Sequence, residues 1–181
     1  MKTLQEIYKN YCGPDGWGDK GTAHTYIDIY SEILKPYRIK SNILEIGIYY
    51  GHSLSMWCEY FEQSTIVGVD IVNNINMDKV KFKPIFCDAT SPTLLEHLKY
   101  YPNFDVIIDD GSHILEHQLA TYNILKNKLS KNGIYIIEDV ANFDTTRKIF
   151  ENLDYTKNIH IIDNRHIKNR YDDVLIIIKN K

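Results

Sequence analysis

The chain has 181 residues, which is the length of one domain. Hydrophobic residues make up 44% of it and charged residues 25%, as is typical of a globular protein that folds around its own core. The 21 basic and 24 acidic side chains give a formal net charge of −3, so we expect no nucleic-acid partner.

The three cysteines, Cys12, Cys58 and Cys87, are isolated from one another and form no CxxC pair. This pattern favours a reducing compartment over a disulfide framework. The N-terminal stretch lacks the apolar core of a signal peptide, and no apolar run is long enough to cross a membrane. We therefore expect a cytoplasmic protein without a membrane partner.

Short apolar runs, each ending in an acidic residue or a glycine, recur along the chain and have the composition of strands covered on both faces. They cover Asn42–Gly47, Thr65–Asp70, Phe82–Asp88, Asp105–Asp110 and Gly133–Asp139. The segments between them have helical spacing. The clearest pattern contains Leu115, Leu119, Tyr122, Leu125 and Leu129. This alternation predicts an α/β fold with a mostly parallel sheet.

The C-terminal part departs from this alternation. A helix is predicted at about 142–153, followed by strands near 158–162 and 173–179. Because only about ten residues join the two strands, they should form an antiparallel hairpin. Two helices and a glycine-rich stretch, CGPDGWGDKG, precede the first strand. We expect one domain, with residues 1–41 as a helical lid segment and 42–181 as the core.

The turn after the first predicted strand contains Glu45, Gly47, Gly51 and Ser53. Glycines here let the backbone approach a ligand at the N-terminus of the next helix. Asp70 ends the second strand, where a carboxylate can accept hydrogen bonds from ribose hydroxyls. The alternative is that the glycines form a tight turn and that Asp70 caps the next segment.

Asp88 ends the third apolar run, so the turn, Asp70 and Asp88 occupy three strand ends in order. This order favours a nucleoside site at the carboxyl edge of the sheet. A nicotinamide-dependent dehydrogenase is a competing interpretation, but Tyr49 and Tyr50 stand where the second glycine of GxGxxG would fall.

Asp109 and Asp110 end the fourth strand, and Glu138 and Asp139 end the fifth. If the two strands are neighbours, these carboxylates converge and need a hard cation or protons. An all-oxygen set suits magnesium, manganese or calcium better than zinc. The alternative is that Asp109 and Asp139 cap the following helices.

His113 follows Asp110 by three residues, at the expected start of the next helix. Its place beside the carboxylates makes it a candidate general base. His113, Glu116 and His117 also spell H-x-x-E-H, the inverted zinc-peptidase signature. That pattern arises readily by chance and leaves the nucleoside site unexplained.

These residues together resemble the class I S-adenosylmethionine-dependent methyltransferases, which have a Rossmann-like fold, here with seven strands. The resemblance is strongest to the metal-dependent sugar O-methyltransferases of the mycinamicin and macrocin type, which are related to cephalosporin hydroxylase-like proteins. The matching stretches are DKGTAHTYIDIY (19–30), ILEIGIYYGHSLSMW (43–57), IVGVDI (66–71), FDVIIDDGSH (104–113) and GIYIIEDV (133–140).

The resemblance implies roles for individual residues. Glu45, Gly47, Gly51 and Ser53 would shape the cofactor loop, Asp70 would hold the ribose, and Asp88 would lie near the adenine. Asp109 would also belong to the residues that bind the cofactor. Asp110, Glu138 and Asp139 would bind Mg²⁺ or Mn²⁺, and His113, beside Asp110, would be the catalytic base. Lys20, His24 and Tyr26 would belong to the lid.

The function implied is S-adenosylmethionine-dependent O-methylation of a sugar hydroxyl, on a small molecule or glycan with vicinal hydroxyls that can chelate the metal. A noncatalytic domain that binds S-adenosylmethionine and serves a partner protein stays open as an alternative. The sequence predicts neither the acceptor nor the oligomeric state.

Overall fold

The computed structural model describes residues 1–11, 18–153 and 156–181. Cys12 and most of the glycine-rich stretch lie outside the described residues. The strands are β1 (Asn42–Ile46), β2 (Thr65–Asp70), β3 (Lys83–Phe86), β4 (Phe104–Asp109), β5 (Leu129–Ile137), β6 (Lys157–Asp163) and β7 (Val174–Asn180). The helices are α1 (Leu4–Tyr8), α2 (Tyr26–Ile33), α3 (His52–Tyr60), α4 (Leu94–His97), α5 (Leu115–Leu125), α6 (Phe143–Leu153) and α7 (Arg165–Lys168).

The seven strands form one sheet in the order β3-β2-β1-β4-β5-β7-β6. The first five strands run parallel, whereas β7 is antiparallel to both β5 and β6. The predicted α/β fold and C-terminal antiparallel pair are therefore confirmed. Strand order reverses between β1 and β4, which is where open α/β sheets bind their ligands.

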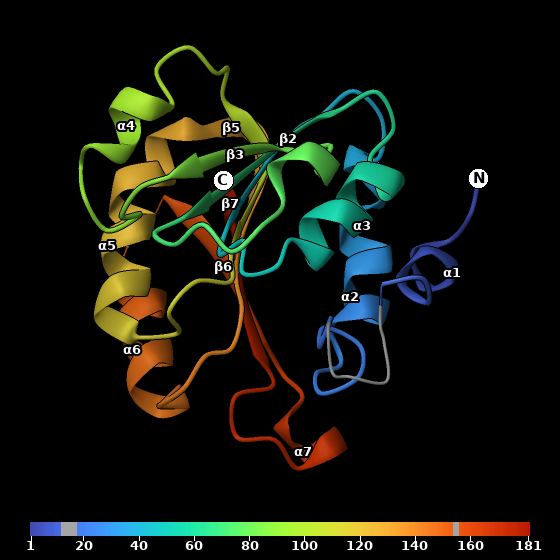
Figure 1. Cartoon of the computed structure of the whole chain (residues 1–181). Helices are drawn as coiled ribbons and strands as arrows, with labels where there is room; N and C mark the ends of the chain where they lie inside the picture. Colours follow the sequence, from blue (N-terminus) through green and yellow to red (C-terminus); the bar gives the residue numbers. More distant parts are fainter. Residues whose placement is uncertain (12–17, 154–155) are drawn as a thin grey trace.

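Helices cover both faces of the sheet, with α1, α2 and α3 on one side and α4, α5 and α6 on the other (Figure 1). Alternate strand residues face the two layers. Ile43 and Val106 belong to the core beneath α1–α3, whereas their neighbours Leu44 and Ile107 belong to the core beneath α4–α6. The near-continuous apolar runs of the sequence are explained by this double burial.

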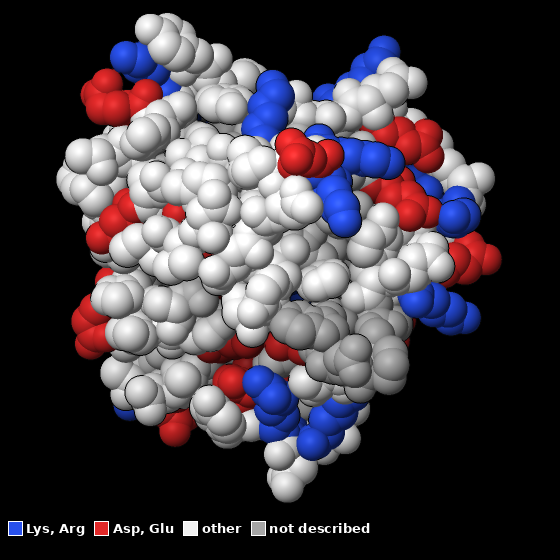
Figure 2. All heavy atoms as spheres, viewed as in Figure 1, with Lys and Arg blue, Asp and Glu red and all other residues white. Residues whose placement is uncertain are grey.

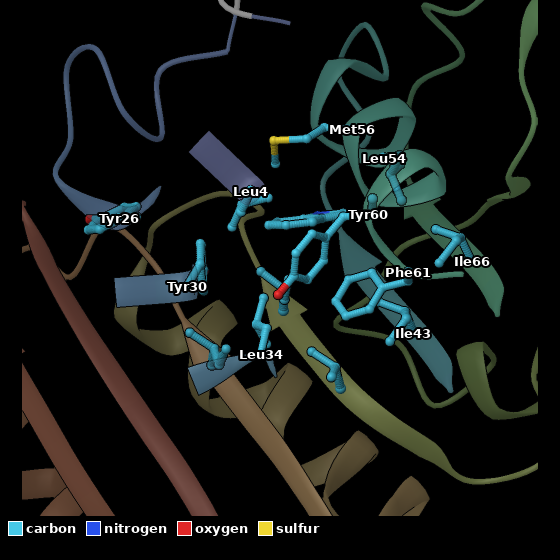
Figure 3. Close-up of a cluster of buried hydrophobic side chains, with 14 of the residues drawn as sticks. Leu4, Tyr26, Tyr30, Leu34, Ile43, Leu54, Met56, Tyr60, Phe61 and Ile66 are labelled. Atoms are coloured by element: carbon cyan, nitrogen blue, oxygen red, sulfur yellow. The ribbon is translucent and has the colours of Figure 1, made fainter. Parts of the chain in front are cut away.

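Aromatic residues fill the core between the sheet and α1–α3. Figure 3 shows Leu4 from α1, Tyr30 from α2 and Tyr60 from α3 meeting there. Trp57 is fully buried and contacts Tyr30 edge to face, with ring centroids 5.6 Å apart. This packing fixes α2, and with it the hydroxyls of Tyr26 and Tyr30, beside the carboxyl end of β5. The division into lid and core stays a prediction.

The assignment of Leu129 to the helix before the fifth strand is wrong. Helix α5 ends at Leu125, a 3₁₀ turn covers Lys126–Lys128, and Leu129 begins β5 opposite Phe104. The apolar spacing continues past the end of the helix because Leu125 and Leu129 face the same hydrophobic cluster. Strand β5 is therefore longer than the predicted 133–139 run.

The hairpin of β6 and β7 extends beyond the rest of the sheet and has α7 at its tip (Figure 1). We call residues 164–173, which comprise α7 and the residues that join it to β6 and β7, the arm. Within the described part of the chain, every helix is too short or too polar to cross a bilayer.

We expect Gly47→Ala to destabilise the fold strongly. Gly47 has φ of +95°, and an added Cβ would lie 2.0 Å from the carbonyl oxygen of Asp110. The free energy of unfolding in urea should fall by about 3 kcal/mol or more, because the substitution combines backbone strain with a clash between two strand ends.

Gly111→Ala is the matched control for that substitution. Gly111 has no positive φ, and its added Cβ would meet the Asp109 carboxylate at 3.3 Å. An equal loss of stability in both variants would contradict the close approach of Gly47, after β1, to the backbone of Asp110, after β4.

Candidate active site

The glycine turn joins β1 to α3 and passes directly beside the end of β4. Gly47 has room for no side chain, and Gly51 adopts φ of +79° immediately before the first residue of α3. The N–H of Asp110 donates to the carbonyl of Ile46 at 2.9 Å. These contacts place the turn and the acidic end of β4 in one unit at the carboxyl edge of the sheet.

The carboxylate of Asp70 fixes the shape of this turn. Its Oδ2 accepts hydrogen bonds from the backbone N–H groups of Ile48 at 2.8 Å and Tyr49 at 2.9 Å, and its Oδ1 accepts one from Val72 at 3.0 Å. A carboxylate has about four acceptor positions, so Asp70 can hold the turn and still accept from a ligand hydroxyl.

Glu45 is the penultimate residue of β1 and is fully buried. Its Oε2 accepts a hydrogen bond from Ser53 Oγ of α3 at 2.9 Å, while its Oε1 lies 3.3 Å from the ammonium of Lys20. Burial raises the pKa of Glu45 to about 7, against the opposing effect of Lys20. Glu45 and Ser53 thus connect the cofactor loop predicted from the sequence to the acidic residues of the neighbouring strands.

Lys20 is the residue around which the carboxylates gather. Its Nζ lies 2.6 Å from both Asp110 Oδ2 and Glu138 Oε1, and only 3% of the residue is exposed. Burial alone would lower the pKa of Lys20, but Asp110, Glu138 and Glu45 raise it well above its ordinary value. Lys20 is therefore a charged ammonium that contacts three carboxylates from three strand ends.

Glu138 has a second partner on α2. The hydroxyl of Tyr30 donates to Glu138 Oε1 at 2.6 Å. Burial and the nearby Asp110 raise the pKa of Glu138 well above its usual range. Both of its contacts use Oε1, which leaves the second oxygen of this carboxylate with capacity for another ligand.

Asp139 lies between two histidines. His24 Nδ1 is 3.3 Å from Asp139 Oδ1, and His113 Nε2 is 3.8 Å from Asp139 Oδ2. The hydroxyl of Tyr26 donates to Asp139 Oδ1 at 2.8 Å. Burial and the charge of Asp110 raise the pKa of Asp139 to about 7.

His113 lies two residues before the first residue of α5 and has φ of +58°, so it belongs to the loop that precedes the helix rather than to the helix itself. Its side chain is 39% exposed. The left-handed backbone turns the imidazole toward Asp139, and this places one titratable side chain at the open rim of the carboxylate cluster.

Asp109 and Asp88 lie on the other side of the glycine turn. Asp109 is buried and accepts a hydrogen bond from the backbone of Gly111, and burial raises its pKa to about 7. Asp88 is exposed and accepts hydrogen bonds from the N–H and hydroxyl of Thr90 at 2.8 and 2.7 Å. Neither residue joins the carboxylates around Lys20.

Two cavities meet at the turn. The acid cavity, of about 320 Å³, contains Lys20, Ser53, Asp110, His113 and Asp139 in its wall. The β3 cavity, of about 380 Å³, is lined by Ile71, Cys87, Asp88, Asp109 and His117. Gly47, Asp70 and Gly111 line both. Figure 2 shows acidic side chains in the recess of this face, next to basic side chains near α7.

The described residues form three sets of candidate metal ligands. Two of the sets share Asp110, and the third contains Asp19, His24 and Asp139. In the inner set, ligand atoms of Glu45, Asp110 and Glu138 lie within 4.8 Å of one another; in the outer set, so do those of Asp110, His113 and Asp139. The structure thus brings the predicted residues Asp110, Glu138 and Asp139 to one site but divides them between the sets.

The H-x-x-E-H residues do not converge. His117 Nδ1 lies 2.8 Å from Ser112 Oγ, whereas His113 faces Asp139. The metal-ligand clusters formed by the described residues contain neither Glu116 nor His117.

The segment that begins with Asp19, Lys20 and Gly21 contributes more contacts to the candidate site than the sequence indicated. Lys20 and Tyr26 were expected in a lid, but they contact Glu138 and Asp139 directly, and Tyr30 was not expected in the site. A signal was present: Tyr26 and Tyr30 are spaced i, i+4 and lie on one face of α2.

No family model matches the chain. Among curated proteins it is 33% identical over 147 residues to demethylmacrocin O-methyltransferase of Streptomyces fradiae, covering 76% of this chain and 36% of that protein. It is 31% identical over 146 residues to mycinamicin VI 2''-O-methyltransferase of Micromonospora griseorubida, covering 76% and 36%. The chain therefore spans about a third of the length of these relatives.

Solved structures agree on the fold. The MycE methyltransferase of mycinamycin biosynthesis, in complex with Mg, SAH and mycinamycin VI, superposes with a TM-score of 0.78 at 22% identity, covering 99% of this chain and 54% of that one. An O-methyltransferase from Bacillus cereus in complex with SAH gives 0.68 at 15% identity, covering 98% and 90%. The chain is a homologue of these macrocin and mycinamicin O-methyltransferases over about three quarters of its length and has the Rossmann-like methyltransferase fold of the solved structures.

Proposed function

We propose that the chain is an S-adenosylmethionine-dependent O-methyltransferase that methylates a sugar hydroxyl with the help of a divalent metal, Mg²⁺ or Mn²⁺. The observation that carries this proposal is the junction of two cavities at the glycine turn, with Asp110, Asp139 and His113 on one side only. The names of the homologues, which are O-methyltransferases, support methyl transfer to an oxygen.

The cofactor would span the two cavities. The β3 cavity, with apolar Ile71 beside Asp88, suits an adenosine group, and Asp70 at the junction has acceptor capacity for ribose hydroxyls. The methyl donor would then reach the acid cavity past Gly47, where the lack of a side chain lets a ligand approach the backbone. Holding the acceptor hydroxyl in line with the methyl group is the main contribution expected of the protein.

The residues present fit a hard divalent cation. Asp110 and Asp139 belong to the outer set, and Glu138 has a carboxylate oxygen beyond the one that contacts Lys20 and Tyr30. The raised pKa values of Asp139 and Glu138 reflect buried negative charge that Lys20 alone does not balance. Oxygen ligands of this kind suit magnesium or manganese. When bound, such an ion lowers the pKa of a coordinated hydroxyl.

His113 would accept the proton of the acceptor hydroxyl. Its Nε2 faces Asp139 at 3.8 Å, and its partly exposed ring lines the acid cavity. Asp139 orients the imidazole and stabilises it once it is protonated. The oxygen–methyl bond then forms as the sulfur–methyl bond breaks, with S-adenosylhomocysteine as the other product.

The first test is methyl transfer from labelled S-adenosylmethionine to a panel of small glycosides with vicinal hydroxyls. We expect Mg²⁺-dependent labelling that EDTA abolishes and that added Mg²⁺ restores, because the carboxylates need a cation to hold the acceptor. Mass spectrometry of the product locates the methyl group. S-adenosylhomocysteine binding without turnover on any glycoside would contradict the proposal and favour a noncatalytic binding domain.

We expect His113→Ala to lower kcat about 10²- to 10⁴-fold, the usual contribution of a general base. Because the imidazole faces the acid cavity, the affinity for S-adenosylhomocysteine, measured by calorimetry, should stay near wild type. His97→Ala, which removes an exposed imidazole from α4, is the matched control and should retain wild-type kcat. Equal turnover in both variants would remove His113 from the mechanism.

A further inference from the structure

Lys20 places a positive charge inside the carboxylate cluster. Its ammonium lies 2.6 Å from Asp110 Oδ2, 2.6 Å from Glu138 Oε1 and 3.3 Å from Glu45 Oε1. These are the three members of the inner set, and the side chains of Glu45 and Glu138 are 0% and 2% exposed. A cation of the chain itself thus occupies the position where three carboxylates could otherwise hold a metal ion.

The backbone on both sides of Lys20 is fixed by separate elements. The carbonyl of Lys20 accepts from the N–H of Tyr26 at 2.8 Å, at the start of α2. The N–H of Gly21 donates to the hydroxyl of Tyr8 at 2.9 Å. An added Cβ at Gly21 would lie 2.6 Å from the Tyr8 ring. The peptide that carries the ammonium is therefore held between α1 and α2.

The arm holds the same loop from outside. Lys168 of α7 donates to the carbonyl oxygens of Gly21, Thr22 and His24, at 2.9, 2.7 and 2.6 Å. The carboxylate of Asp173 accepts from the N–H of Thr25 at 3.1 Å. With these contacts, withdrawal of Lys20 from the inner set would require several hydrogen bonds to break together.

Among the described residues, no lysine or arginine forms an ion pair with Asp139 of the outer set, whose charged-group contacts are with His24 and His113. Lys20 contacts Asp110 through Oδ2 only, so the other oxygen of this carboxylate can serve the outer set. Asp139 and His113, the other members of the outer set, face the acid cavity. The ammonium can therefore fill the inner set while Asp110 and Asp139 of the outer set hold a metal ion, which leaves the His113 imidazole uncoordinated as the base.

We propose that Lys20 is a built-in counter-cation that fills the inner set and thereby limits the site to a single divalent cation at the outer set. Lys20 is a positioning residue: it holds Glu138 and Asp110 in place and is not itself in contact with the acceptor. The inference deepens the proposed function, on which it rests for the presence of a divalent cation at the outer set.

The test replaces the ammonium with an unbranched apolar side chain of similar length, Lys20→Met. Mn²⁺ bound per chain is counted by electron paramagnetic resonance of the free ion. We expect one Mn²⁺ in the wild type and two in Lys20→Met, because the three carboxylates of the inner set then attract a second ion. The double variant Lys20→Met/Glu45→Gln, which removes one of those carboxylates, should return to one.

Two further variants separate this role from a structural one. Tyr30→Phe removes another partner of Glu138 but keeps the ammonium, and Lys20→Arg keeps the charge; both should bind one Mn²⁺. An unchanged count in folded Lys20→Met would overturn the inference. If the wild type binds no Mn²⁺ and Lys20→Met binds one, Lys20 still excludes a metal ion from the inner set, but the single cation at the outer set is overturned together with the metal dependence of the proposed function.

If Lys20→Met does not fold, the wild type still provides a decisive experiment. Amine acylation followed by peptide mass spectrometry reports the accessibility of Lys20 with and without saturating Mg²⁺, and Lys99, whose side chain is 52% exposed, serves as the reactive reference. We expect Lys20 to stay protected in both conditions. Acylation of Lys20 at the rate of Lys99 once Mg²⁺ is added would show that the metal displaces the ammonium and would overturn the inference.

Discussion

Repulsion between buried carboxylates is the constraint on which this structure depends. Glu45, Asp110, Glu138 and Asp139 converge where β1, β4 and β5 end, and three of these four are almost fully buried. Uncompensated charges in such a place cost several kcal/mol each. The ammonium of Lys20 offsets part of this repulsion, while burial, and to a smaller extent the charge of Asp110, raises the pKa of Glu45 and Asp139 to about 7.

The fold brings these charges together by simple means. A parallel sheet places its carboxyl ends on one edge, so residues far apart in sequence meet there. Helix α2 then supplies Tyr26 and Tyr30 to Asp139 and Glu138, and the loop before it supplies Lys20. The segment of residues 1–41 therefore contributes side chains both to the polar site and to the hydrophobic core. The same arrangement leaves the side of the site that faces the acid cavity open to ligands.

The sequence predicted those features that depend on local pattern. Asp70, Asp110 and Asp139 each end an apolar run, so their positions on the sheet edge could be inferred from the run alone. The ion pairs of Lys20 join residues 90 and 118 positions apart in sequence, and no local pattern indicates such a contact. His113 is a related case, because no local pattern indicates its left-handed backbone, with φ of +58°. Leu129 was misassigned because it packs in the same hydrophobic cluster as Leu125 of α5, although it is the first residue of β5.

The central claim is that an ammonium and one divalent cation share the carboxylates of this site. The most direct measurement is an anomalous difference map from crystals grown with Mn²⁺ and S-adenosylhomocysteine. The account predicts one Mn²⁺ peak between Asp110 and Asp139, with the Lys20 ammonium still in contact with Glu45 and Glu138. A peak at the position of that ammonium, with Lys20 turned away, would contradict it.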